Sequence, residues 1–230
     1  MRPFNLSEQL LHDLGKDIVN GVLKPGTVLP KVELLSEQRG VSRTVSREAI
    51  KGLVARRLVE SSTRTGTVVK AREEWLWLDP DVLIWASESD HQKEFFMQLN
   101  QLRFAIEPAA VELAAQFATE EDKKEIRYRY EQLEKYYNDK EKWPEADYAY
   151  HWSIISSSHN ELMLSLMQNL YNALIKTRRI NVTISSKKER DRSLKLHKEL
   201  MEEVCNGNGK LAKEAMREQL LQVESIVKAY

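Results

Sequence analysis

Three side chains in the second half of the chain have the types and spacing of metal ligands. Asp147 and His151 are four residues apart in a stretch with helical periodicity, so both project from one face of a helix. His197 lies on a later predicted helix and can supply a third ligand. These residues could hold a divalent ion such as zinc, nickel or manganese. A polar helix pair with satisfied hydrogen bonds is the alternative that needs no ion, and the spacing alone favours it.

A second candidate is an arginine on an apolar stretch. Arg103 is surrounded in sequence by leucine and isoleucine, where a cation is costly unless it is paired. Its ordinary partner is Glu107, one helical turn on. Its functional partner would be the carboxylate of a small ligand, which the planar guanidinium fork fits. Arg178, Arg179 and Asn181 are weaker candidates of the same kind.

A third set of side chains could contact DNA. If residues 42–54 form a helix, one face is apolar and the other presents three cations and a hydroxyl: Arg43, Thr44, Arg47 and Lys51. A major groove accepts one helix, and arginine can bond bidentately to guanine or contact phosphates. A solvated basic face of an ordinary amphipathic helix is the alternative.

The elements around this basic helix have a recognisable order. We expect helices over 5–23, 31–38 and 42–56, then short strands over 58–60 and 67–70. A polar turn containing Gly66 separates the two strands. Helix, short helix, turn, helix and hairpin is the order of a winged helix-turn-helix.

The rest of the chain shows no strand pattern of useful length. We expect about seven helices, near 81–89, 92–117, 119–138, 140–157, 160–184, 188–206 and 209–228. The predicted fold class is therefore mainly α, a winged helix-turn-helix followed by an all-α helical bundle that binds a ligand. The predicted domains are 1–72 and 81–230, joined by an aromatic and acidic linker over 73–80, whose two tryptophans indicate that it packs on something.

Charge is distributed unevenly between these parts. The chain has 35 basic and 35 acidic residues, but the first 72 residues contain 13 basic and 7 acidic ones. A basic N-terminal part suggests a polyanionic partner there. No apolar run approaches the ~18 residues of a membrane span. The single cysteine, Cys205, fits a reducing compartment, so we expect a cytoplasmic protein.

Three blocks of the N-terminal part resemble the GntR family of bacterial repressors. They are Lys24-Pro25-Gly26 with Leu29-Pro30, Val41-Ser42-Arg43-Thr44 with Arg47-Glu48-Ala49, and Gly66-Thr67 of the wing. The resemblance implies that Ser42, Arg43, Thr44 and Arg47 face DNA, with Lys51 on the same face and Arg64, Thr65 and Gly66 in the adjoining groove. Two departures are Glu33, where the family usually has a DNA-facing arginine although Lys31 is near, and Ser46 on the apolar face.

The C-terminal part resembles the all-helical ligand domain of the FadR-type branch of that family. The residues that carry this resemblance are Leu102-Arg103, Glu107-Pro108-Ala109-Ala110, Asp147, His151, Asn160, His197 and the helix that reaches Gln219. The connector Trp77–Trp85 is similar to that of galactonate-type sugar-acid repressors. In many relatives a fourth metal ligand, a histidine, stands where this chain has Gln219, a weakly basic amide. The effector-binding residues implied are Arg103, Asp147, His151, Arg179, His197 and Gln219.

These observations predict a DNA-binding repressor rather than an enzyme. It would bind a palindromic operator as a homodimer. A small carboxylate effector, a sugar acid such as an aldonate or uronate, would change its operator affinity. One alternative is a regulator that responds to the metal itself. Another is a metal-dependent hydrolase using Asp147, His151 and His197, but no further general acid or nucleophile is evident.

Overall fold

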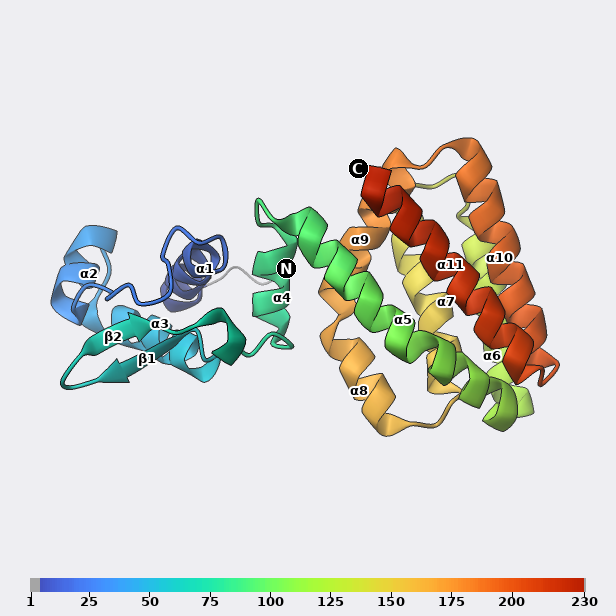
Figure 1. Cartoon of the computed structure of the whole chain (residues 1–230), viewed down its shortest axis with the longest axis horizontal. Helices are drawn as coiled ribbons and strands as arrows, with labels where there is room; N and C mark the ends of the chain where they lie inside the picture. The colour runs from blue at the N-terminus through green and yellow to red at the C-terminus, as the bar shows by residue number, and fades with distance from the viewer. Residues whose placement is uncertain (1–4, 230) are drawn as a thin grey trace. The chain divides into compact units, whose positions relative to one another are not determined.

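The structure of the protein is a computed structural model, which describes residues 5–229. The chain divides into two compact units, Met1–Gln92 and Lys93–Tyr230 (Figure 1). The predicted fold class is confirmed, with a small two-stranded wing and otherwise helices in the described residues. None of these helices is long and apolar enough to cross a membrane.

Three helices form the body of the N-terminal unit. They are α1 (Leu6–Val19), α2 (Val32–Arg39) and α3 (Arg43–Ala55). A capping box between Asn5 and Glu8 starts α1, and Gly40, with a left-handed φ of 63°, ends α2. Both helices pack on α3, whose apolar face is buried and leaves its opposite face to solvent.

The wing follows α3 directly. Strands β1 (Val59–Ser62) and β2 (Gly66–Val69) pair antiparallel, with Val59 opposite Val69. The extended segment after α1 adds to this hairpin, because the Leu29 amide donates to the Thr67 carbonyl at 2.8 Å. The predicted helix-turn-helix order and wing are therefore present, with boundaries shifted by a few residues.

The aromatic connector packs on its own unit, as its tryptophans indicated. A short 3-10 turn, η1 (Arg72–Glu74), is followed by α4 (Pro80–Ser87). The Trp75 ring is buried, and the Arg72 guanidinium lies 5.0 Å from its centroid. Trp85 of α4 is also buried, against α1. The structure groups α4 with the N-terminal unit, so the boundary between the two units falls after Gln92, later in the chain than the predicted linker over 73–80. The predicted domain limits stay a prediction.

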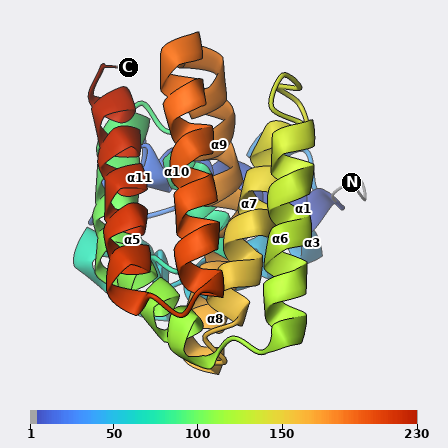
Figure 2. The ribbon, with the colours of Figure 1, turned by 90° about the vertical axis from the view of Figure 1, so that its right-hand side faces the viewer.

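The second unit is a bundle of helices (Figure 2). Its elements are α5 (Gln92–Phe117), α6 (Glu120–Lys135), α7 (Trp143–Ser156), α8 (Glu161–Asn169), α9 (Tyr171–Ile184), α10 (Lys187–Cys205) and α11 (Gly209–Ala229). The single helix predicted over 160–184 is wrong, since it breaks at Leu170. That residue is buried and keeps helical φ and ψ, so neither glycine nor proline marks the break.

The bundle core positions the polar residues of interest. Apolar side chains of α5, α6, α7, α9, α10 and α11 form one buried cluster. Within it the Tyr150 hydroxyl donates to the His197 carbonyl at 2.7 Å, which ties α7 to α10. The rest of the α7 face beside Tyr150 carries Asp147 and His151.

Candidate DNA-binding helix and effector pocket

The structure places the predicted DNA-contacting residues on one exposed helix face. Arg43, Thr44 and Arg47 of α3 are exposed, and so is Lys51, whose ammonium pairs with Glu48 at 2.8 Å. Ser42 caps the helix by accepting from the Val45 amide at 3.2 Å. The exposed face therefore presents cations and a hydroxyl to solvent, as a groove-reading helix requires.

Ser46 does not disturb the apolar face on which it lies. Its side chain is buried, and its hydroxyl lies 3.0 Å from the Ser36 hydroxyl of α2. Ser36 in turn donates to the Val32 carbonyl at 2.6 Å. The departure from the family pattern is thus satisfied within the helix pair.

The remaining predicted DNA contacts lie at the start of α2 and at the tip of the wing. Lys31 is exposed at the N-terminus of α2, close in sequence to the exposed Glu33. Arg64, Thr65 and Gly66 are exposed in the hairpin turn, where Gly66 has a φ of 78° that a side chain would strain.

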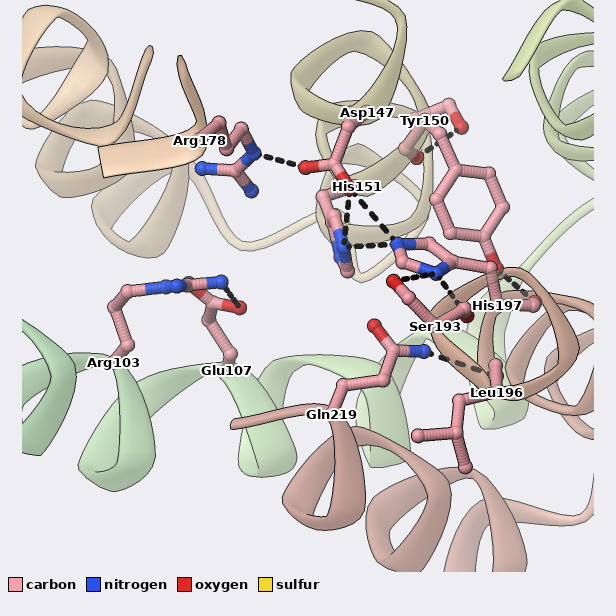
Figure 3. A network of polar contacts seen from close by, with 11 residues as sticks. Arg103, Glu107, Asp147, Tyr150, His151, Arg178, Ser193, Leu196, His197 and Gln219 are labelled. Carbon is pink, nitrogen blue, oxygen red and sulfur yellow. Dashed lines mark hydrogen bonds and ion pairs between the residues drawn. The ribbon is translucent and has the colours of Figure 1, made fainter. Parts of the chain in front are cut away.

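In the helical bundle, the predicted metal ligands converge on one point. We call Asp147, His151 and His197 the Asp–His–His cluster; all three are buried, and Figure 3 shows them facing one another from α7 and α10. His197 Nε2 lies 2.9 Å from Asp147 Oδ1 and 3.2 Å from His151 Nε2. The third separation, from His151 Nε2 to Asp147 Oδ1, is 4.0 Å.

Hydrogen bonding orients the His197 ring for such a role. Its Nδ1 lies 2.6 Å from the Ser193 carbonyl oxygen, which can only accept, so Nδ1 carries a proton. In the neutral ring, Nε2 then offers a lone pair toward a carboxylate oxygen. Only a proton or a metal cation makes that contact favourable, and backbone support of the other ring nitrogen is usual for metal-binding histidines.

The cluster fits a divalent ion. Ligand atoms that each lie about 2.0–2.2 Å from one ion are roughly 3–3.5 Å apart. Two of the three separations, 2.9 and 3.2 Å, are close to this range, and the third, 4.0 Å, is longer. Two imidazoles and a carboxylate are also a donor set that zinc and related ions accept. Asp147, His151 and His197 are therefore the described residues that could hold a metal.

The electrostatic setting of the cluster keeps its acid charged and one of its bases neutral. Burial by itself raises the pKa of the Asp147 carboxyl, but the Arg178 guanidinium and the two histidines hold that pKa well below its usual range. Burial lowers the pKa of His151 well below its usual range. A carboxylate and a neutral imidazole are the forms that bind metals.

Of the two neighbouring arginines named as weaker candidates from the sequence, only Arg178 reaches the cluster. Arg178 of α9 is buried and donates to Asp147. Arg179, the residue predicted to contact an effector, points elsewhere: its side chain is 62% exposed and lies 3.3 Å from Glu145. The structure thus brings Arg178, and not Arg179, to the site.

Arg103 has the ordinary partner that its sequence suggested. Its Nε donates to Glu107 at 2.6 Å and its Nη2 to the other carboxylate oxygen at 3.3 Å, in a fully buried pair. Arg103 nevertheless lines the same pocket as the Asp–His–His cluster. That pocket, which we call the central pocket, has a cavity volume of about 70 Å³.

Several residues of the central pocket were missed or underrated from the sequence. Gln219 was selected and does line it, with its Nε2 donating to the Leu196 carbonyl at 3.0 Å. Ser193 and Gln222 were missed, since nothing in their sequence neighbourhood distinguishes them from surface polar residues. Asn181 was a weak candidate, and its position one turn after Arg178 places both on the same face of α9.

Both parts of the chain match known protein families. Residues 6–69 match the model of bacterial regulatory proteins of the gntR family, and residues 98–222 match the FCD domain. The galactonate operon transcriptional repressor of Escherichia coli strain K12 is 30% identical over 214 residues, 92% of each chain. The HTH-type transcriptional regulator LutR of Bacillus subtilis strain 168 is 33% identical over 216 residues, 93% of this chain and 97% of that one.

A solved structure shares the fold along the whole chain. It is described as "Lar controls the expression of the Listeria monocytogenes agr system and mediates virulence", and it aligns with a TM-score of 0.67 at 20% identity, over 100% of this chain and 99% of that chain. Both sequence relatives are transcription regulators, not enzymes, which rules out the hydrolase interpretation of the Asp–His–His cluster. The chain belongs to the GntR family of transcription regulators, with a DNA-binding helix-turn-helix domain followed by an FCD effector domain.

Proposed function

We propose that this regulator represses transcription and releases its operator when a sugar acid, an aldonate or uronate, binds in the central pocket. The observation that carries the proposal is the convergence of two buried guanidiniums, Arg103 and Arg178, with the Asp–His–His cluster in one pocket. Planar guanidiniums suit carboxylates. The relative named as a galactonate operon repressor supports the choice of a sugar acid.

A divalent ion would strengthen the attraction for such an anion. Both guanidiniums are already paired, Arg103 with Glu107 and Arg178 with Asp147, so these four groups carry no net charge. An ion held by Asp147, His151 and His197 would make the pocket positive. It would also accept electron pairs from the carboxylate and the 2-hydroxyl of a sugar acid. The same cluster supports a second candidate function, a regulator for which the ion itself is the signal.

On the DNA side, we propose that α3 enters the major groove of a palindromic operator bound by a homodimer. Ser42, Arg43, Thr44, Arg47 and Lys51 would contact bases or phosphates, with Lys31 nearby and Arg64, Thr65 and Gly66 of the wing in the adjoining groove. Their exposure on one helix face and one hairpin supports this role. One helix contacts few base pairs, so a homodimer with two-fold symmetry, which places one α3 helix on each half of a palindromic operator, would read a longer site.

The test measures operator affinity of the full chain with sugar acids and divalent ions added separately. A sugar acid that weakens operator binding while its neutral sugar does not supports the first function. An ion that weakens operator binding by itself supports the second.

Arg43→Ala and Arg47→Ala should each cost about 1–3 kcal/mol in operator binding if the side chain meets a base. The control variant is Arg179→Ala, which changes an exposed arginine of the other unit. DNA binding by both variants at wild-type affinity and salt dependence would contradict the helix assignment.

A further inference from the structure

Three polar atoms of the central pocket are buried without a hydrogen-bond partner in the described part of the chain. They are Gln219 Oε1, Asn181 Oδ1 and Arg178 Nη1, and all three residues line the pocket. A buried donor or acceptor that lacks a partner costs about 1–3 kcal/mol. Such atoms gathered in one pocket indicate what a ligand must offer there.

The orientation of the Gln219 amide is fixed by its other end. Its Nε2 donates to the Leu196 carbonyl at 3.0 Å, which can accept only from the nitrogen, so Oε1 is the atom left for the pocket. Figure 3 shows the oxygen turned away from Leu196, toward the space between the Asp–His–His cluster and the Arg103–Glu107 pair. Gln219 is 5% exposed, so bulk water does not solvate this acceptor.

A metal ion alone does not meet these demands. A cation could accept an electron pair from the Gln219 oxygen, but it cannot satisfy the Arg178 N–H, which needs an acceptor. The Asn181 oxygen lies on α9, whereas Gln219 lies on α11, and this oxygen also needs a hydrogen-bond donor. A chain of hydroxyl groups meets all three, because each hydroxyl both donates and accepts.

We propose that Gln219, together with Asn181 and Arg178, selects effectors that carry several hydroxyl groups in addition to their carboxylate. Gln219 is then a specificity-determining residue and not a metal ligand. The inference rests on the proposed function, a carboxylate effector in the central pocket. It separates polyhydroxylated acids from short 2-hydroxy acids, which can reach the Asp–His–His cluster but have no further hydroxyls to offer.

The experiment is calorimetric titration of the full chain with D-galactonate and with L-lactate as probes. Wild type is compared with Gln219→Met, which keeps the length of the side chain but removes the amide. We expect Gln219→Met to weaken galactonate binding about tenfold and to leave lactate binding within about twofold, since a site built to bond a hydroxyl loses that contact only for the hydroxylated ligand.

The chain offers a matched control in Asn100. Its Nδ2 also donates to a backbone carbonyl, that of Leu220, at 3.2 Å, and the residue is similarly buried at 4% exposure. Its oxygen likewise lacks a partner in the described residues, but Asn100 does not line the central pocket. Asn100→Leu should therefore leave the preference for galactonate unchanged. Asn181→Leu is a second test variant, expected to reduce the same preference, should Gln219→Met not fold.

The possible outcomes separate this inference from the proposed function. Wild type that prefers galactonate, with a preference lost in Gln219→Met and kept in Asn100→Leu, supports it. Equal loss for both acids, or no loss, overturns it while leaving a carboxylate effector in place. Loss of divalent-ion binding by Gln219→Met, titrated in parallel, also overturns it and makes Gln219 a ligand. Wild type that binds neither acid nor other sugar acids overturns the proposed function as well.

Discussion

The buried imidazole of His151 ties the stability of the helical bundle to pH. Because burial lowers its pKa in the folded chain well below the ordinary 6.5, the unfolded chain binds more protons just below that pH. The stabilisation is complete above about pH 6.5 and is lost as the pH falls toward the folded-state pKa. Asp147, whose pKa is also lowered, acts in the same direction only below about pH 3.8.

We therefore expect the free energy of unfolding of chelator-treated protein to fall between pH 7.5 and 5.5. One additional proton bound by the unfolded chain corresponds to a slope of up to about 1.4 kcal/mol per pH unit. Urea denaturation at several pH values measures this slope. His151→Gln, which cannot titrate, should give a shallower slope by about that amount, and an unchanged slope would mean that other groups control the acid sensitivity.

We expect the Asp–His–His cluster to bind a divalent ion weakly. Three ligands bind a divalent ion more weakly than four, so wild type should lose its ion readily to a chelator. His151→Ala removes a ligand and should abolish binding, whereas Gln219→His adds an imidazole at a position that faces the pocket and should tighten it. Calorimetric titration of zinc into chelator-treated protein compares the three. Equal affinities would place the ion elsewhere in the chain.

The contrast between Arg178 and Arg179 shows where residue-level reasoning from sequence reaches its limit. The i, i+4 spacing of Asp147 and His151 fixes their common face, and the structure brings them together with His197. Spacing within α9 separates neighbouring arginines by about 100°. It does not say which of them faces α7, since that depends on how two helices are rotated against each other. In the structure, the packing of α9 turns Arg178 toward α7, where it donates to Asp147.

At the scale of elements, the packing of α1 on α3 and α4 depends on two glycines inside helices. A Cβ at Gly15 would overlap the six-membered ring of Trp85, whose indole nitrogen also donates to His12 at 2.8 Å. A Cβ at Gly52 would lie 2.7 Å from Leu11 Cδ2, the tip of a flexible side chain. The first neighbour is rigid and anchored, whereas the second can rotate.

Alanine substitution at the two positions should thus give opposite results. Alanine favours a helix over glycine by up to about 1 kcal/mol, and Gly52→Ala should keep most of that gain. Gly15→Ala must displace the Trp85 ring and should lose about 1–3 kcal/mol of stability. Thermal denaturation with tryptophan fluorescence compares the variants. Stabilisation by both would show that α4 does not hold Trp85 firmly against α1.

Elements could be predicted where the sequence carries a local signal. Ser42, Thr119 and Ser186 cap helices that begin close to the predicted positions. The break between α8 and α9 carries no such signal at Leu170, because a buried leucine fits a continuous helix equally well. The grouping of α4 with the N-terminal unit carries no local signal either, since it depends on the contact of Trp85 with a distant helix.

At the scale of the whole molecule, the charge is divided unevenly between the DNA-binding part and the rest of the chain. The first 72 residues carry an excess of six positive charges, and the remaining residues an equal negative excess. Operator affinity should therefore fall steeply as salt displaces the phosphate contacts. A regulator of this kind joins two binding equilibria, and the free energy that links them is the same seen from either site.

That reciprocity gives the last prediction. If D-galactonate weakens operator binding by a factor of about 5–150, the range usual for allosteric coupling, saturating operator must weaken galactonate binding by the same factor. Operator affinity is measured with and without galactonate, and galactonate affinity with and without operator, at one salt concentration. Gln219→Met should lower the galactonate affinity of both forms of the protein and leave operator affinity without ligand unchanged. Weakening that keeps growing as galactonate is raised, and never reaches a constant factor, would mean that the acid competes with DNA by binding α3 or the wing directly, because two ligands that share one surface exclude each other without limit.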